Sequence, residues 1–131
     1  MTAVLLDTHV WAWSLSNDVQ LSESARTHIA GASLVYISPI SLFEIGQKVR
    51  IGKWPEMVPY VRDLPRLVAE QGALVASLSP DICLSASILP WAHRDPFDRL
   101  LAATALALNA KLVSMDVAFD SLQDWPGRIP D

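Results

Sequence analysis

Four acidic residues stand at positions where their carboxylates could serve one common site. Asp7 and Asp116 each directly follow a short apolar run of the kind that forms a buried strand. Glu44 lies within an apolar helical stretch, and Asp98 lies near the start of another. Carboxylate oxygens are the ligands that Mg²⁺ and Mn²⁺ prefer. If the fold brings the four together, they predict a divalent-metal site and metal-assisted hydrolysis.

Each of these acids also has an ordinary structural interpretation, which is the more frequent one when a residue is judged singly. The two acids that follow apolar runs are suited to accept hydrogen bonds from free backbone N–H groups in the next turn. Asp98 lies three residues after Asp95 and fits a capping-box-like arrangement at a helix start. Glu44 lies four residues before Lys48, the spacing of an exposed ion pair that contributes ~0.2–0.5 kcal/mol.

The four acids carry more information when they are considered together. A parallel sheet brings the carboxyl ends of its strands to one edge, where such folds bind ligands. Carboxylates within a few ångströms of one another repel unless they are protonated or hold a cation, so a Mg²⁺ or Mn²⁺ site is the simplest interpretation. Zinc is less favoured, because Cys83 is the only cysteine and His9, His28 and His93 lack the spacing of zinc ligands.

Hydrophobic periodicity predicts short strands that alternate with helices. Strands are predicted at 3–6, 34–38, 111–115 and, more weakly, 73–78. Helices are predicted at 9–15, 22–31, 40–51, 80–89, 96–108 and 117–122, with one kinked or two short helices within 53–72. The helix after Asp95 has the clearest ends, since Asp95 is an N-cap, Pro96 suits the first helical position and Asn109 is a natural left-handed terminator.

This alternation, with each strand a continuous apolar run, indicates an α/β fold whose parallel sheet is covered by helices on both faces. A chain of 131 residues has the usual size of one domain, so residues 1–131 are expected to form a single domain. The segment after Leu122 is rich in proline and glycine and contains no strong closing strand. The sheet is therefore expected to be short at that end.

Composition excludes several classes of protein. Hydrophobic residues make up 51% of the chain and charged residues 18%, which excludes a disordered chain. The single cysteine cannot form an intramolecular disulfide, so a reducing cytoplasm is expected. The N-terminus lacks a basic cluster and its apolar run stops at Asp7, so we expect no signal peptide. No stretch resembles the ~20 mostly apolar residues of a membrane span, so we expect no membrane association.

The net charge of −4 at first argues against a nucleic-acid partner. However, the chain has 14 acidic and 10 basic side chains, so the four candidate acids account for the whole excess, and two divalent cations would offset it. The candidates for phosphate contacts are four basic residues near these acids, Lys48, Lys53, Arg94 and Arg99, although such residues are more often solvated. The five tryptophans could stack on bases, but core or interface packing is their more frequent role.

Four segments resemble a known family. They are LLDTH at 5–9, SLFEI at 41–45 followed by Lys48 and Gly52-Lys53, HRDPFDRLL at 93–101, and LVSMD at 112–116. In order and spacing they look like the PIN domain of VapC-type toxins, from residue 5 to about residue 119. The runs HRDPFDRLL and SLFEI are the more specific signals. Ser114 stands where the family often has threonine, which keeps the hydroxyl.

The resemblance implies a three-layer α/β/α sandwich with a central parallel sheet of four to five strands, and a metal-dependent endoribonuclease that hydrolyses RNA phosphodiester bonds. It implies that the catalytic residues and ligands of one or two Mg²⁺ or Mn²⁺ ions are Asp7, Glu44, Asp98 and Asp116. Residues expected to support these ligands are Thr8, Asp95 and Ser114. The resemblance also implies a homodimer and a small antitoxin protein that blocks the acidic pocket.

Two alternatives stay open at this point. The chain could be a PIN-fold RNA-processing nuclease, or a silent binding partner, outside a toxin–antitoxin pair. A receiver-like signalling module also gathers acidic residues around Mg²⁺, but it would need a phosphoacceptor after a central strand. The mid-chain candidate, Asp63, lies instead in a proline-flanked helical segment. The sequence does not determine the RNA target or the roles of His9 and His93.

Overall fold

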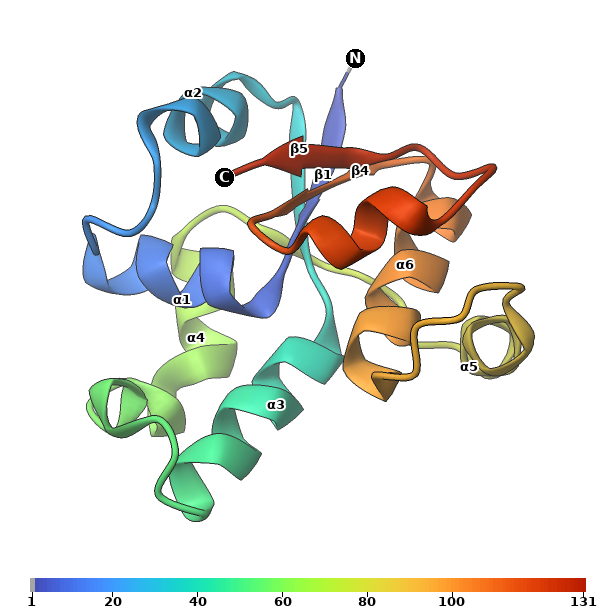
Figure 1. Ribbon diagram of the computed structural model, residues 1–131. Helices are drawn as coiled ribbons and strands as arrows, with labels where there is room; N and C mark the ends of the chain where they lie inside the picture. The colour runs from blue at the N-terminus through green and yellow to red at the C-terminus, as the bar shows by residue number, and fades with distance from the viewer. Residues whose placement is uncertain (1) are drawn as a thin grey trace.

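The computed structural model describes residues 2–131 (Figure 1). The strands are β1 (Ala3–Leu6), β2 (Leu34–Ile37), β3 (Leu74–Val75), β4 (Lys111–Ser114) and β5 (Arg128–Pro130). The α-helices are α1 (Thr8–Ser16), α2 (Glu23–Gly31), α3 (Pro39–Arg50), α4 (Leu64–Glu70), α5 (Pro80–Ile88) and α6 (Pro96–Leu108). Three 3₁₀ helices are η1 (Pro55–Met57), η2 (Val61–Asp63) and η3 (Val117–Ser121). Within residues 2–131, no helix combines the length and apolarity needed to cross a bilayer.

The five strands form one sheet in the order β3-β2-β1-β4-β5, and every neighbouring pair is parallel. The chain builds the sheet outward in one direction from β1 through β2 to β3, and in the other direction through β4 to β5. The strand order therefore reverses between β1 and β4. In open parallel sheets this reversal leaves a crevice beyond the carboxyl ends of the two strands, where ligands bind.

Helices cover both faces of the sheet. Val4 and Leu6 of β1 belong to a core cluster that contains Trp11 and Ile45, whereas Leu5 belongs to a second cluster that contains Leu101. Successive strand residues point to opposite faces, so both faces of β1 are buried. Figure 1 shows α1 and α4 on one side of the strands and α5 and α6 on the other. The predicted three-layer arrangement around a parallel sheet is confirmed.

Short polar side chains begin the helices that approach the crevice. Asp7 is the N-cap of α1 and accepts a hydrogen bond from Thr8 N. Ser38 caps α3, and Asp95 caps α6, while Asn109 ends α6 in the left-handed conformation at φ 51°. These caps satisfy N–H groups that a helix end leaves unpaired, which is why the predicted starts of these helices are confirmed to within two residues.

Two predicted helical segments take a different form. The segment 53–72 consists of η1, η2 and α4, and Pro65 lies in the first turn of α4 instead of breaking a helix. Proline is tolerated there because the first helical N–H groups have no partner within the helix. The last predicted helix, 117–122, is the 3₁₀ helix η3.

The two edges of the sheet differ from the prediction. The third strand was expected over 73–78, but β3 has two residues, both exposed. The tail, predicted to lack a strong closing strand, contains β5, which pairs with β4 through Leu112–Arg128 and Val113–Ile129. A three-residue strand between prolines has no periodicity to detect, and its last residue, Pro130, is tolerated because it lies on an edge strand.

Candidate active site

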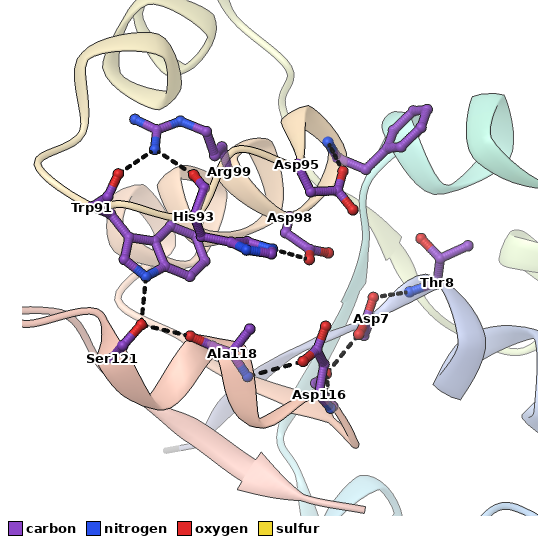
Figure 2. A network of polar contacts seen from close by, with 12 residues as sticks. Asp7, Thr8, Trp91, His93, Asp95, Asp98, Arg99, Asp116, Ala118 and Ser121 are labelled. Carbon is purple, nitrogen blue, oxygen red and sulfur yellow. Dashed lines mark hydrogen bonds and ion pairs between the residues drawn. The ribbon is translucent and has the colours of Figure 1, made fainter.

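An open cleft of about 580 Å³ lies beyond the carboxyl ends of β1 and β4. The acidic residues that line it are Asp7, Glu44, Asp95, Asp98 and Asp116. In Figure 2 the side chains of Asp7, Asp98 and Asp116 gather around a common space. The fold thus brings to one cleft all four predicted acids, from β1, α3, α6 and the end of β4. Their chemical roles stay a prediction.

Asp7 is a buried carboxylate that leaves the sheet directly after β1, with 7% of the residue exposed. Its Oδ1 accepts a hydrogen bond from Thr8 N at 2.7 Å, and its Oδ2 accepts one from Ser114 Oγ at 2.6 Å. Burial raises the pKa of Asp7, although these two hydrogen bonds act in the opposite direction. The capping interpretation therefore holds for Asp7, and the same side chain also lines the cleft.

Ser114 links the ends of the two central strands. It is the last residue of β4 and is fully buried. Its Oγ donates to Asp7 Oδ2 and accepts a hydrogen bond from Asp116 N at 3.0 Å. Asp116 Oδ1 in turn accepts from Ala118 N at 2.9 Å, which begins η3. A single hydroxyl thereby ties two of the acids into one hydrogen-bonded chain.

Asp98 lies in the first turn of α6 but takes no part in capping that helix. Asp95 Oδ1 accepts the hydrogen bond from Phe97 N, whereas Asp98 Oδ2 faces His93 Nε2 at 2.7 Å. The predicted capping-box-like pair is therefore wrong, because the Asp98 carboxylate is taken up by the imidazole at the cleft. His93, Asp98 and Asp116 offer ligand atoms that all lie within 4.8 Å of one another. Burial raises the pKa of Asp98 to about 6, with further contributions from the nearby acids.

His93 was left without a role by the sequence, and Arg99 explains how it is held. The Arg99 guanidinium donates to the carbonyl oxygens of Leu89, Trp91 and His93 at 2.6–2.8 Å. Figure 2 shows two of these bonds, which fix the loop that carries His93. Arg99 therefore organises the loop, and these bonds already occupy its guanidinium, which disfavours the phosphate contact expected for it. The position of His93 within the HRDPFD run is the sequence signal that could have found it.

Two polar contacts connect α3 to the site. Lys48 Nζ donates to Glu44 Oε2 at 2.8 Å, but the pair is less exposed than its spacing suggests, since Glu44 is 8% exposed. Thr8 Oγ1 and Ser41 Oγ lie 2.9 Å apart and join α1 to α3. Ser41 was not among the predicted residues, because a serine inside an apolar helix gives no distinct signal.

His9, for which no role was predicted, lines the same cleft. Its ring stacks on Trp54, with centroids 4.5 Å apart and an interplanar angle of 25°. Burial lowers the pKa of His9, and the charge of Lys48 adds to this effect. The neutral imidazole is therefore favoured near neutral pH.

The comparisons with known proteins agree with this geometry. A model of the PIN domain family matches residues 4–124 of the chain. The chain belongs to the PIN domain family. Ribonuclease VapC22 of Mycobacterium tuberculosis (strain ATCC 25618 / H37Rv) is 31% identical to it over 117 residues, which cover 88% of each protein. The resemblance drawn from the four sequence segments is thus confirmed.

Two solved structures share the PIN fold of this chain. One is VapBC2 from Rickettsia felis bound to a DNA fragment from its promoter, with a TM-score of 0.65 and 19% identity over 96% of this chain and 97% of that one. The other is FitAcB from Neisseria gonorrhoeae, with a TM-score of 0.63 and 22% identity over 97% of each chain. At these identities the similarity establishes the fold.

The receiver-like alternative does not fit the PIN structure. Its candidate phosphoacceptor, Asp63, ends the 3₁₀ helix η2 and not a strand. The Asp63 side chain is about half exposed and pairs with Arg66 at 3.5 Å. The acids that follow central strands are Asp7 and Asp116, which line the PIN cleft.

The raised pKa of Asp98 leads to a prediction about the stability of the metal-free PIN domain. We expect Asp98→Asn to raise the free energy of unfolding at pH 7.5 by about 1–2 kcal/mol, a value discounted for the solvent that still reaches this carboxyl. The pKa rises from the ordinary 3.8 to about 6 on folding, so the folded chain holds the proton more tightly. This tighter proton binding stabilises the folded wild type. The contribution is fully present below pH ~4 and is lost as the pH rises through 6.

Urea unfolding in EDTA at pH 4 and pH 7.5 measures this effect. The variant should exceed the wild type at pH 7.5, and the difference should shrink at pH 4, where the folded wild type holds the proton and the unfolded chain holds it in part. Asp81→Asn, at an exposed acid on α5, is the matched control and should have little effect. A variant that is less stable than the wild type at pH 7.5 would show that Asp98 has a stabilising structural role.

Proposed function

We propose that this protein is a metal-dependent endoribonuclease that acts as the toxin of a toxin–antitoxin pair. The observation that carries the proposal is the set of five carboxylates that lines one cleft at the reversal point of the sheet. The 31% identity to a protein named Ribonuclease VapC22, over 88% of the chain, supports RNA as the substrate. A processing nuclease outside a toxin–antitoxin pair is the second candidate, which the same cleft would also serve.

The residues of the cleft fit a divalent cation such as Mg²⁺ or Mn²⁺. All four proposed ligands, Asp7, Glu44, Asp98 and Asp116, offer carboxylate oxygens, the donors that these ions prefer. The pKa values of Asp7 and Asp98 are both raised in the protein alone, so the cleft disfavours the negative charge that it concentrates. When bound, such a cation supplies the positive charge that balances the carboxylates, activates water for attack on a phosphodiester and neutralises charge on the leaving oxygen.

The chain's own contribution is to orient the carboxylates before substrate binds. Thr8 N and Ser114 Oγ fix both oxygens of Asp7. His93 holds one oxygen of Asp98, and Lys48 holds one oxygen of Glu44. Neighbours of this kind keep ligands in one orientation, and as hydrogen-bond donors they favour the ionised carboxylates that a cation needs.

We propose that RNA binding requires the cation, because the cleft alone would repel a polyanion. Five carboxylates line the cleft, and the one lysine or arginine among its lining residues, Lys48, is paired with Glu44. Arg94, within the HRDPFDRLL segment, and Lys53, after the SLFEI segment, are both exposed. They remain candidates for contacts with RNA phosphates. Binding in Mg²⁺ should therefore weaken sharply on chelation, unlike binding by a basic patch.

We expect RNA cleavage with Mg²⁺ or Mn²⁺, loss of cleavage in EDTA, and recovery when excess Mg²⁺ is restored. The same ions should raise the melting temperature of the wild type, because a ligand that binds the folded state stabilises it. Cleavage of defined RNAs and thermal unfolding, each with Mg²⁺, Mn²⁺ and EDTA, measure the two effects.

Asp7→Asn combined with Asp98→Asn is the control for the thermal measurement, since it removes two ligands and keeps the shapes of the side chains. The melting temperature of this double variant should not respond to Mg²⁺. Undiminished cleavage by the wild type in EDTA, with the fold intact, would contradict the metal dependence.

The proposed function also involves protein partners. We propose an antitoxin as the physiological inhibitor, based on the resemblance to VapC-type toxins and on the relative VapC22. The homodimer, the cytoplasmic location and the single domain over residues 1–131 stay predictions. Exposed apolar side chains such as Phe43, Leu84 and Ile88, which are 61%, 62% and 72% exposed, are the kind of surface that a partner covers.

A further inference from the structure

A smaller pocket of about 190 Å³ lies beside the acidic cleft, and the proposed hydrolysis does not use it. His9, Trp13 and Gln20 line both the pocket and the cleft. The two hollows therefore share a wall and form one continuous surface. The pocket is smaller than the ~300–1,000 Å³ of pockets that take drug-sized ligands, so it suits a single flat ring system.

Aromatic side chains form the wall of this pocket. His9 and Trp13 lie one turn apart on α1, with ring centroids 5.9 Å apart. Trp54, which precedes η1, stacks on His9 at 4.5 Å, and Lys48 Nζ lies 5.5 Å from the centroid of the Trp54 ring. Trp13 and Trp54 are 8% and 9% exposed, so packing fixes both rings. Packed against these two buried rings, the partly exposed ring of His9 is the surface that suits stacking of a nucleobase.

The polar lining of the pocket suits a base rather than a phosphate. Ser16, Asp18, Gln20 and Glu56 line it, and none of its lining residues is lysine or arginine. Asp18 Oδ1 already accepts a hydrogen bond from Gln20 N at 2.9 Å. Glu56 is exposed, and no ion pair to it is found among residues 2–131. Its carboxylate is therefore available as an acceptor for the N–H groups of a base edge.

We propose that this pocket binds one base of the RNA strand next to the scissile phosphate, and that it selects bases with an exocyclic amino group over uracil. The inference rests on the proposed nuclease function. Asp7 caps α1 and His9 lies in its first turn, so a strand held at Asp7 passes the pocket. Guanine, adenine and cytosine each present an amino group to a carboxylate, whereas the one donor on the pairing edge of uracil, N3–H, lies between two carbonyl oxygens that repel a carboxylate. Unstacked bases of single-stranded RNA are commonly recognised by stacking and by their edges.

Cleavage of a pool of single-stranded RNAs of random sequence in Mg²⁺, with the new ends sequenced, tests the proposal. At one fixed position beside the cut, we expect uracil to be depleted several-fold relative to the pool. Glu56→Gln should reduce that depletion by at least half, because an amide can donate to a uracil carbonyl. The matched control, Asp81→Asn, lies on α5, outside both hollows, and should leave the base pattern unchanged.

A pair of His9 variants tests the stacking part of the proposal. His9→Ala should raise KM by ~5–100-fold, the range expected for loss of one base–aromatic stack, with a smaller change in kcat. His9→Phe keeps a ring on Trp54 and should retain most of the affinity, which a hydrogen-bonding or acid–base role of the imidazole would not predict. Circular dichroism confirms that each variant is folded.

The outcomes separate this inference from the function on which it rests. Metal-dependent cleavage with uniform base frequencies around the cut would overturn the base pocket and leave the nuclease intact. A uracil depletion that is unchanged in both Glu56→Gln and His9→Ala would also overturn it, because the selection would then come from elsewhere. Absence of any metal-dependent cleavage by the wild type would overturn the proposed function and the pocket together.

Discussion

Replacement of either Asp7 or Asp98 by asparagine will reduce RNA cleavage in Mg²⁺ by at least ~100-fold, while the fold is retained. Loss of a residue that only supports a metal ligand costs ~10–100-fold, so loss of a ligand itself should cost more. Asparagine is as good an N-cap as aspartate, so Asp7→Asn still starts α1. In Asp98→Asn the side-chain carbonyl can still accept a hydrogen bond from His93. Initial rates on a defined RNA, at saturating Mg²⁺, measure the loss.

Two measurements distinguish loss of a metal ligand from loss of the fold. Circular dichroism and thermal unfolding in EDTA should give a folded protein, and Asp98→Asn should be more stable than the wild type at pH 7.5. Asp81→Asn, which changes an exposed acid on α5, should cleave at the wild-type rate. If either cleft variant is folded and cleaves as fast as this control, the assigned ligand is wrong.

Ser114→Ala will reduce cleavage by ~10–100-fold, the second-largest effect that we expect. The Ser114 hydroxyl donates to Asp7 Oδ2 at 2.6 Å and accepts from Asp116 N at 3.0 Å. Its loss leaves the buried Asp7 carboxylate with fewer donors and Asp116 N without this acceptor. We expect a stability loss of about 1–3 kcal/mol from these unpaired groups.

The pH profile separates a positioning role of Ser114 from a purely structural one. The Ser114 hydrogen bond lowers the pKa of Asp7, so its loss should raise that pKa further and move the acidic limb of the cleavage profile to higher pH. Ser114→Thr keeps the hydroxyl in a strand position that favours threonine, and it should restore most of the activity. An Ala variant whose rate falls without this displacement would indicate that Ser114 acts through stability alone.

Several elements were predictable because their signals are local. β1 was predicted at its observed bounds, since four apolar residues before Asp7 have no competing interpretation. The start of α6 followed from Asp95 and Pro96, and its end from Asn109. By contrast, β5 depends on pairing with β4, and a three-residue strand cannot be stable without its neighbour. β5 could therefore not be predicted from the sequence.

Some residues of the candidate site were likewise predictable from local signals, and others were not. The positions of Asp7 and Asp116 after apolar runs were sufficient to predict that these two carboxylates converge, because strand ends in a parallel sheet meet at one edge. The contacts of His93 and Ser41 were not predicted, because each depends on the orientation of an element that is distant in the sequence.

Capping, periodicity and turn chemistry act over a few residues, so most of the elements, their alternation and the acids that end or begin them could be predicted from the amino-acid sequence alone. The packing of these elements in three dimensions decided that Asp98 faces His93 and not its own helix start, and that Arg99 is used to hold a loop. It also decided that a buried hydroxyl joins Asp7 to Asp116. These contacts depend on how the helices pack against the sheet. No local sequence pattern encodes that packing.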